Sequence, residues 1–154
     1  MKTLSQWLSE YGESHQNETN KLIHWICVPI IFFSVLAMLY SIKLPWVISG
    51  YQLNVGIIVA VLVLVYYASL SLSLSVGMFL FIVICVGICI FLEQTNTLPL
   101  WQFALILFVF AWIGQFYGHK VEGAKPSFFK DLQFLMIGPA WLMSFVYKKL
   151  GIAV

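Results

Sequence analysis

The sequence predicts an all-α integral membrane protein, a polytopic helix bundle that forms a single domain over residues 1–154. The chain is 62% hydrophobic and 9% charged, whereas about a quarter of the residues in soluble domains are charged. No Asp, Glu, Lys or Arg lies between Lys43 and Glu93. A chain of 154 residues cannot bury so much apolar surface on its own, so lipid is its expected solvent.

The N-terminal residues are expected to form a short amphipathic helix that the mature protein retains. They are polar up to Lys21 and lack the apolar region and small-residue cleavage site of a signal peptide. We expect this helix to carry His15. Asn17, Thr19 and Asn20 are typical helix-capping residues, so they predict a turn there and a membrane helix that begins near Asn20.

Four apolar segments, at residues 25–42, 53–69, 76–92 and 98–117, are predicted to be transmembrane helices, since about 20 residues are needed to cross the bilayer. The serines and leucines that alternate over residues 69–75 could resemble a strand, but we expect a tight interhelical turn. A fifth segment, residues 132–147, is shorter and carries Gly138-Pro139 near its middle. We expect it to be kinked, re-entrant or interfacial.

The distribution of lysine predicts a cytoplasmic N-terminus, because positive charge accumulates on the cytoplasmic side of membranes. In that orientation only Lys43 of the loop lysines faces outward, and the host membrane is a bacterial inner membrane or the endoplasmic reticulum. The net charge is +2 and arginine is absent, which argues against nucleic-acid binding. The three cysteines lie within apolar runs and are interpreted as buried small hydrophobic residues; they are Cys27, Cys85 and Cys89.

The three histidines of the chain are expected to meet at one membrane face. His15 and His24 precede the first predicted span, and His119 follows the fourth. Two segments that flank an even number of spans lie on the same side of the bilayer. The sequence therefore predicts that imidazoles from both ends of the chain converge at the cytoplasmic face.

Further polar residues share helix faces with these histidines. Residues four apart lie on the same face, which pairs Tyr11 with His15 and Asn20 with His24. Gln115 and Glu122 share the face of His119. Gly114 and Gly118 form a small-xxx-small pair that would let another helix approach closely.

This pattern predicts a metal site, whose ligands would be His15, His24 and His119. Two or three histidines with a carboxylate suit mononuclear iron, whereas three histidines could equally hold zinc with a bound water. Glu122 is the first candidate for the carboxylate, followed by Glu18 and Glu13. The alternative is that the histidines are ordinary headgroup-level anchors in a non-enzymatic lipid-binding or scaffold protein.

Two motifs carry a family resemblance. Tyr11-x3-His15-x4-Asn20-x3-His24-x4-Pro29, followed by Trp112-Ile-Gly-Gln-Phe-Tyr-Gly-His119, is similar to a small membrane family whose fungal members are iron(II)-dependent 2-hydroxy fatty acid dioxygenases. The likeness extends from about Trp7 to Gly138-Pro139.

The resemblance implies an Fe²⁺ enzyme of lipid alpha-oxidation, which uses O2 to convert a 2-hydroxy fatty acid into a fatty acid one carbon shorter. The acyl tail would lie between apolar helices in the membrane lipid. Lys21 and Lys120 could attract the substrate carboxylate, although membrane-surface lysine is their default role. Candidate substrate-binding residues are Tyr11, Asn20, Lys21, Gln115 and Lys120. A zinc-dependent lipid hydrolase is a further alternative.

Overall fold

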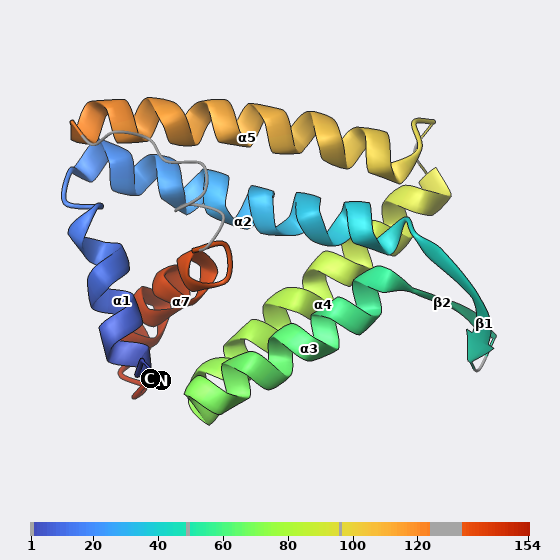
Figure 1. The fold of residues 1–154 in the computed structure, drawn as a ribbon, viewed down its shortest axis with the longest axis horizontal. Helices are drawn as coiled ribbons and strands as arrows, with labels where there is room; N and C mark the ends of the chain where they lie inside the picture. Colours follow the sequence, from blue (N-terminus) through green and yellow to red (C-terminus); the bar gives the residue numbers. More distant parts are fainter. Residues whose placement is uncertain (1, 49, 96, 124–133) are drawn as a thin grey trace.

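The computed structural model describes residues 2–48, 50–95, 97–123 and 134–154, which are almost entirely helical (Figure 1). Over these residues the elements are α1 (Leu4–Glu13), α2 (Glu18–Tyr40), β1 (Lys43–Ile48), β2 (Tyr51–Asn54), α3 (Val55–Leu70), α4 (Leu72–Thr95), α5 (Leu100–Glu122) and α7 (Ile137–Leu150). The predicted helical class is confirmed. One small addition was not predicted, an antiparallel hairpin formed by β1 and β2.

The pairing of α2 with α5 is the most extensive in the fold; the two helices lie side by side and run in opposite directions (Figure 1). Glycines make this approach possible. A Cβ atom at Gly114 would lie 2.7 Å from Cys27 Sγ, and one at Gly118 would lie 2.4 Å from Asn20 Oδ1. The predicted role of this small-residue pair in close helix packing is therefore confirmed.

A second hairpin of helices, α3 and α4, is joined through the single extended residue Ser71, so the predicted tight turn is confirmed. Asn54 caps α3, because its Oδ1 accepts a hydrogen bond of 2.9 Å from Ile57 N. The first turns of α4 pack against the last turns of α3 around three fully buried side chains, Tyr67, Leu74 and Met78.

The C-terminal helix α7 packs against α1 and α4. Tyr147 Oη donates a hydrogen bond of 2.7 Å to Ser73 O and accepts one of 3.0 Å from Gly77 N. Because α7 begins at Ile137, Gly138 and Pro139 lie in its first turn, where proline is tolerated. The pair therefore lies at the start of the helix and not in its interior, and the predicted kink is not confirmed.

The predicted start of that C-terminal segment, residue 132, lies outside the described residues. Its re-entrant or interfacial position stays a prediction.

The β-hairpin lies between the first two predicted spans and turns at Gly50, whose φ of +84° favours glycine. Ile48 pairs with Tyr51, and Val47 pairs with Gln52. Its sequence contains Pro45 and lacks the alternation of apolar and polar residues that indicates a strand. Local sequence therefore gave little reason to expect it.

Three described helices, α2, α4 and α5, are long and apolar enough to cross a membrane. The fourth predicted span, α3, has 16 residues, which gives it a length of about 24 Å against about 30 Å of hydrocarbon. Its crossing stays a prediction. Large apolar side chains point outward, such as Phe91 and Phe110, as expected for surfaces that face lipid. All three cysteines are free and buried, as predicted.

We predict that Gly118→Ala destabilises the protein, because its Cβ would enter the space of Asn20 Oδ1. Overpacking of this kind costs about 1–3 kcal/mol. Gly87→Ala in α4 is the matched control, because a Cβ there meets nothing within 4 Å and alanine favours the helix. Denaturant unfolding in detergent micelles measures both. Equal stability of the two variants would contradict the close α2–α5 contact.

Candidate metal centre

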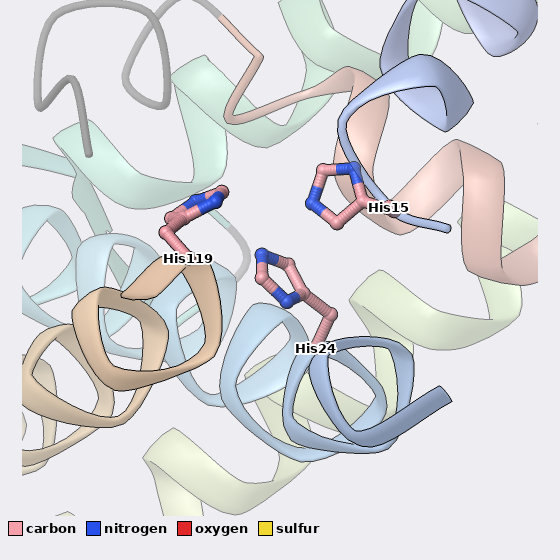
Figure 2. Close-up of side chains that lie close together, drawn as sticks. All are labelled: His15, His24 and His119. Carbon is pink, nitrogen blue, oxygen red and sulfur yellow. The ribbon is translucent and has the colours of Figure 1, made fainter. Parts of the chain in front are cut away.

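The three histidines form a compact buried cluster (Figure 2). Their ring centroids lie 4.2 Å apart for His15 and His24, 5.1 Å for His24 and His119, and 5.6 Å for His15 and His119. One potential ligand atom from each lies within 4.8 Å of the others. None of the three residues is more than 4% exposed. The predicted convergence of imidazoles from both ends of the chain is confirmed.

Each histidine comes from a different element. His24 lies in the second turn of α2, and His119 lies in the last turn of α5, which ends at Gly123 with a φ of +76°. His15 was expected on the N-terminal helix, and this is wrong. Since α1 ends at Glu13, His15 lies in the turn before α2. This break lets its ring turn toward His24.

Backbone carbonyls fix the orientation of two rings. His15 Nδ1 lies 2.6 Å from Tyr11 O, and His24 Nδ1 lies 2.9 Å from Asn20 O. A carbonyl oxygen can only accept a hydrogen bond, so each Nδ1 must carry the proton and donate it. In the neutral ring this leaves the lone pair on Nε2, the arrangement usual for metal-binding histidines.

Aromatic rings cover the cluster on the side of α1 and α7. The Tyr11 ring stacks on His15 with a centroid separation of 4.2 Å and an interplanar angle of 12°, so the predicted pairing of these residues is confirmed. Trp141 of α7 lies 5.5 Å from His15. These rings keep the imidazoles out of water, and they limit His15 to a narrow range of orientations.

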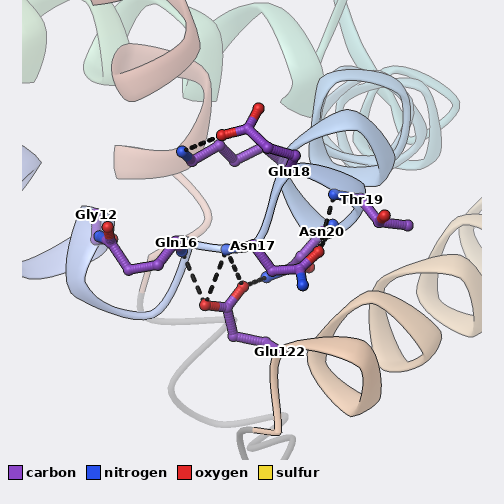
Figure 3. Close-up of polar contacts among 8 residues, drawn as sticks. Gly12, Gln16, Asn17, Glu18, Thr19, Asn20 and Glu122 are labelled. Atoms are coloured by element: carbon purple, nitrogen blue, oxygen red, sulfur yellow. Dashed lines mark hydrogen bonds and ion pairs between the residues drawn. The ribbon is translucent and has the colours of Figure 1, made fainter.

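Glu122 holds the turn that carries His15 (Figure 3). Its Oε1 accepts a hydrogen bond of 2.8 Å from Gln16 N. Its Oε2 accepts bonds of 2.9 Å from Asn17 N and from Asn20 Nδ2. Asn20 Nδ2 also donates to Ser14 O at 3.3 Å. The carboxylate thus fastens the end of α5 to the α1–α2 turn, and we call this set of bonds the Glu122 clasp.

A family model described as 2-hydroxy-palmitic acid dioxygenase Mpo1-like matches residues 1–150. The chain belongs to the Mpo1-like family. The family resemblance carried by the two histidine motifs is therefore confirmed. No curated protein and no solved structure matches the chain.

The histidines of this Mpo1-like chain could hold a metal ion. Metal–imidazole bonds of about 2.1 Å place neighbouring ligand nitrogens about 3–3.5 Å apart. The observed separations, up to 4.8 Å, would close to that range with small side-chain shifts. The Nδ1–carbonyl bonds leave Nε2 of His15 and His24 as the ligand atoms, so the residues present fit a metal.

The other predicted site residues divide into two groups. Tyr11 and Gln115 are buried and line one small cavity, of about 20 Å³, between α1, α2 and α5. Lys21 Nζ instead pairs with Glu18 Oε1 at 2.9 Å, and Lys120 is exposed. The structure therefore brings Tyr11 against His15 and places Gln115 in the wall of the adjoining cavity. The contacts of the two lysines give no support to a role at the cluster.

Sequence reasoning missed Trp141 and the backbone amides of Gln16 and Asn17. A backbone N–H has no sequence signature, and the only available signal was the capping preference of Asn17, whose Oδ1 does accept from Thr19 N at 2.9 Å. Among the described residues, the compact ligand group contains the three histidines without a carboxylate. A ligand role of Glu122, Glu18 or Glu13 stays a prediction.

We predict that Glu122→Ala loosens the α1–α2 turn of this Mpo1-like protein and weakens metal binding. The variant leaves Gln16 N, Asn17 N and Asn20 Nδ2 without their acceptor, a loss of about 1–2 kcal/mol. Hydrogen exchange of residues 14–20 in the metal-free protein should become faster. Glu93→Gln, at a carboxylate that pairs with Lys43 away from the cluster, is the control.

Metal titration of the same variants separates the two roles considered for Glu122. If the carboxylate is a ligand and not a clasp, metal affinity will fall while exchange in the turn stays at the wild-type rate. That result would contradict the positional role.

Proposed function

We propose that this chain is a membrane-bound, iron-dependent dioxygenase of lipid alpha-oxidation, which shortens a 2-hydroxy fatty acid by one carbon. The observation that carries the proposal is the buried cluster of His15, His24 and His119, whose potential ligand atoms lie within 4.8 Å of one another. The description of the family, a 2-hydroxy-palmitic acid dioxygenase, supplies the class of reaction and of substrate.

The reaction class favours iron over zinc. Three imidazoles could hold either metal, but zinc has no redox chemistry and a dioxygenase must transfer electrons to O2. When bound, iron(II) would supply a redox centre that can orient a 2-hydroxy carboxylate and O2 together.

The residues of the chain have three tasks in this proposal. The Tyr11 and Asn20 carbonyls hold the rings of His15 and His24 with Nε2 available as ligand. The Tyr11 and Trp141 rings exclude water from the cluster, which protects reactive species from side reactions. Glu122 holds the His15 turn against α5, so that all three imidazoles are preorganised.

The substrate head would reach the cluster from the membrane surface. We place this end of the helices at the cytoplasmic face, in agreement with the lysine distribution, in a bacterial inner membrane or the endoplasmic reticulum. Lys21 and Lys120 remain candidates for attraction of the carboxylate over a distance. Lys21 would have to leave its ion pair with Glu18 in order to contact the substrate directly.

Two other functions differ in measurable ways. A lipid-binding or scaffold protein would purify without iron or zinc. A zinc-dependent lipid hydrolase would act equally well without oxygen.

We predict about one iron per chain in anaerobically purified protein, together with oxygen-dependent conversion of 2-hydroxypalmitate to pentadecanoate. Replacement of His15, His24 or His119 by alanine should lower metal content and abolish turnover, because each imidazole provides one of three ligand atoms. Elemental analysis and an oxygen electrode measure the two effects. Glu93→Gln is the control, since Glu93 pairs with Lys43 away from the cluster. Full activity in all three histidine variants would disprove the assigned site.

A further inference from the structure

A second, larger cavity lies between α2 and α3, with a volume of about 300 Å³. Every residue that lines it is apolar. They are Phe32, Val35, Leu36 and Leu39 of α2; Val59, Ala60 and Val63 of α3; and Leu135 and Met136 before α7. A volume of this size is typical of small-molecule sites. The absence of any polar lining side chain restricts the occupant to hydrocarbon, because a polar group would lose its hydrogen bonds to water there.

The small and the large cavity follow one another along one side of α2, and Tyr11, whose ring stacks on His15, lines the small one. Val28 and Ile31 line the small cavity beside Tyr11 and Gln115, and Phe32 starts the large cavity one residue further on. Leu135 lines both cavities. The two cavities therefore adjoin at Leu135 and follow one another along α2.

The distance along α2 from His24 to the large cavity suits a long acyl chain. Helices rise 1.5 Å per residue, so Phe32 lies about 12 Å and Leu39 about 22 Å beyond His24 along α2. A molecule with its carboxylate at the histidines would place only the distal part of a long tail in the cavity. Short acids would not reach it.

We infer that the cavity between α2 and α3 is the acyl-chain site for the distal tail of a long-chain 2-hydroxy fatty acid, and that Ala60 in its wall helps to set the chain-length limit. The inference rests on the proposed function for the identity of the head group. Ala60 is 6% exposed and packs among Phe32 and Leu36. It is the smallest residue of the cavity wall, so a larger side chain there occupies space that the tail would use.

The first test measures chain-length preference over a panel from 2-hydroxyoctanoate to 2-hydroxystearate. Ala60→Leu should lower kcat/KM for 2-hydroxypalmitate on the order of ten-fold, the usual effect of a few methylene groups in an apolar pocket. The value for 2-hydroxyoctanoate should stay the same. Leu36→Ala enlarges the cavity and should move the preference toward longer chains, which keeps the test decisive if one variant folds poorly.

Val61→Leu is the matched control, because the neighbouring Val61 of α3 is 54% exposed and does not line the cavity. Its chain-length profile should equal that of the wild type. If Ala60→Leu and Leu36→Ala also leave the profile unchanged, the acyl-chain site is disproved while the dioxygenase proposal stands.

The second test needs no turnover. Iron-loaded protein in phosphatidylcholine vesicles, kept under nitrogen so that no turnover occurs, is photolabelled with 2-hydroxypalmitate that carries a diazirine at the end of its tail. Labels on Leu36, Leu39 or Val59 that excess 2-hydroxypalmitate displaces support the site, even if the oxygenase assay fails. Labels confined to the outward side chains of α4, such as Phe91, or labels that 2-hydroxypalmitate does not displace, would overturn it, since ordinary contact with lipid produces that result.

Discussion

The close contact between α2 and α5 is the constraint on which the candidate centre depends. His24 and His119 belong to these two helices, and their rings can meet only if the helix axes approach closely at this end. Gly118, one residue before His119, provides the room, because Asn20 Oδ1 occupies the place that a Cβ would need. The backbone carbonyl of Asn20 also accepts the hydrogen bond from His24 Nδ1, and its side-chain Nδ2 donates to Glu122 Oε2. Packing and ligand orientation therefore depend on one side chain and its backbone.

The third imidazole is held by a different kind of interaction. His15 lies in a turn that has no helix to stiffen it, and the Glu122 clasp takes the place of that support by binding the amides of Gln16 and Asn17. Charged acceptors form stronger hydrogen bonds than neutral ones, and these bonds connect residues more than 100 positions apart in sequence. The stacked ring of Tyr11 then fixes the remaining rotation of His15. Two helices and a clasped turn thus hold the three imidazoles together.

Sequence could predict the meeting of the histidines because topology, and not local detail, determines it: an even number of apolar segments separates His24 from His119. Tyr11, Gln115 and the pair Gly114 and Gly118 could also be predicted as neighbours of the site, because the fixed period of a helix determines which residues share a face. The Glu122 clasp could not be predicted from the sequence, because two of its partners are the backbone amides of Gln16 and Asn17. The β-hairpin and the late start of α7 depend on tertiary pairing with weak local signals.

The fold has a polar end at the histidines and an apolar cavity between α2 and α3. At the polar end, α1, α2, α5 and α7 enclose the histidines with hydrogen bonds and stacked rings. The first turn of α3 lies against the C-terminal end of α2, and α3 leans away from α2 from there on (Figure 1). The wall of the cavity between them contains aliphatic side chains with one phenylalanine and one methionine. An amphipathic ligand matches this division, because its head needs fixed geometry whereas its tail needs only apolar contact, which is non-directional. The side chains that fix an exact geometry are thus confined to the histidine end of the fold.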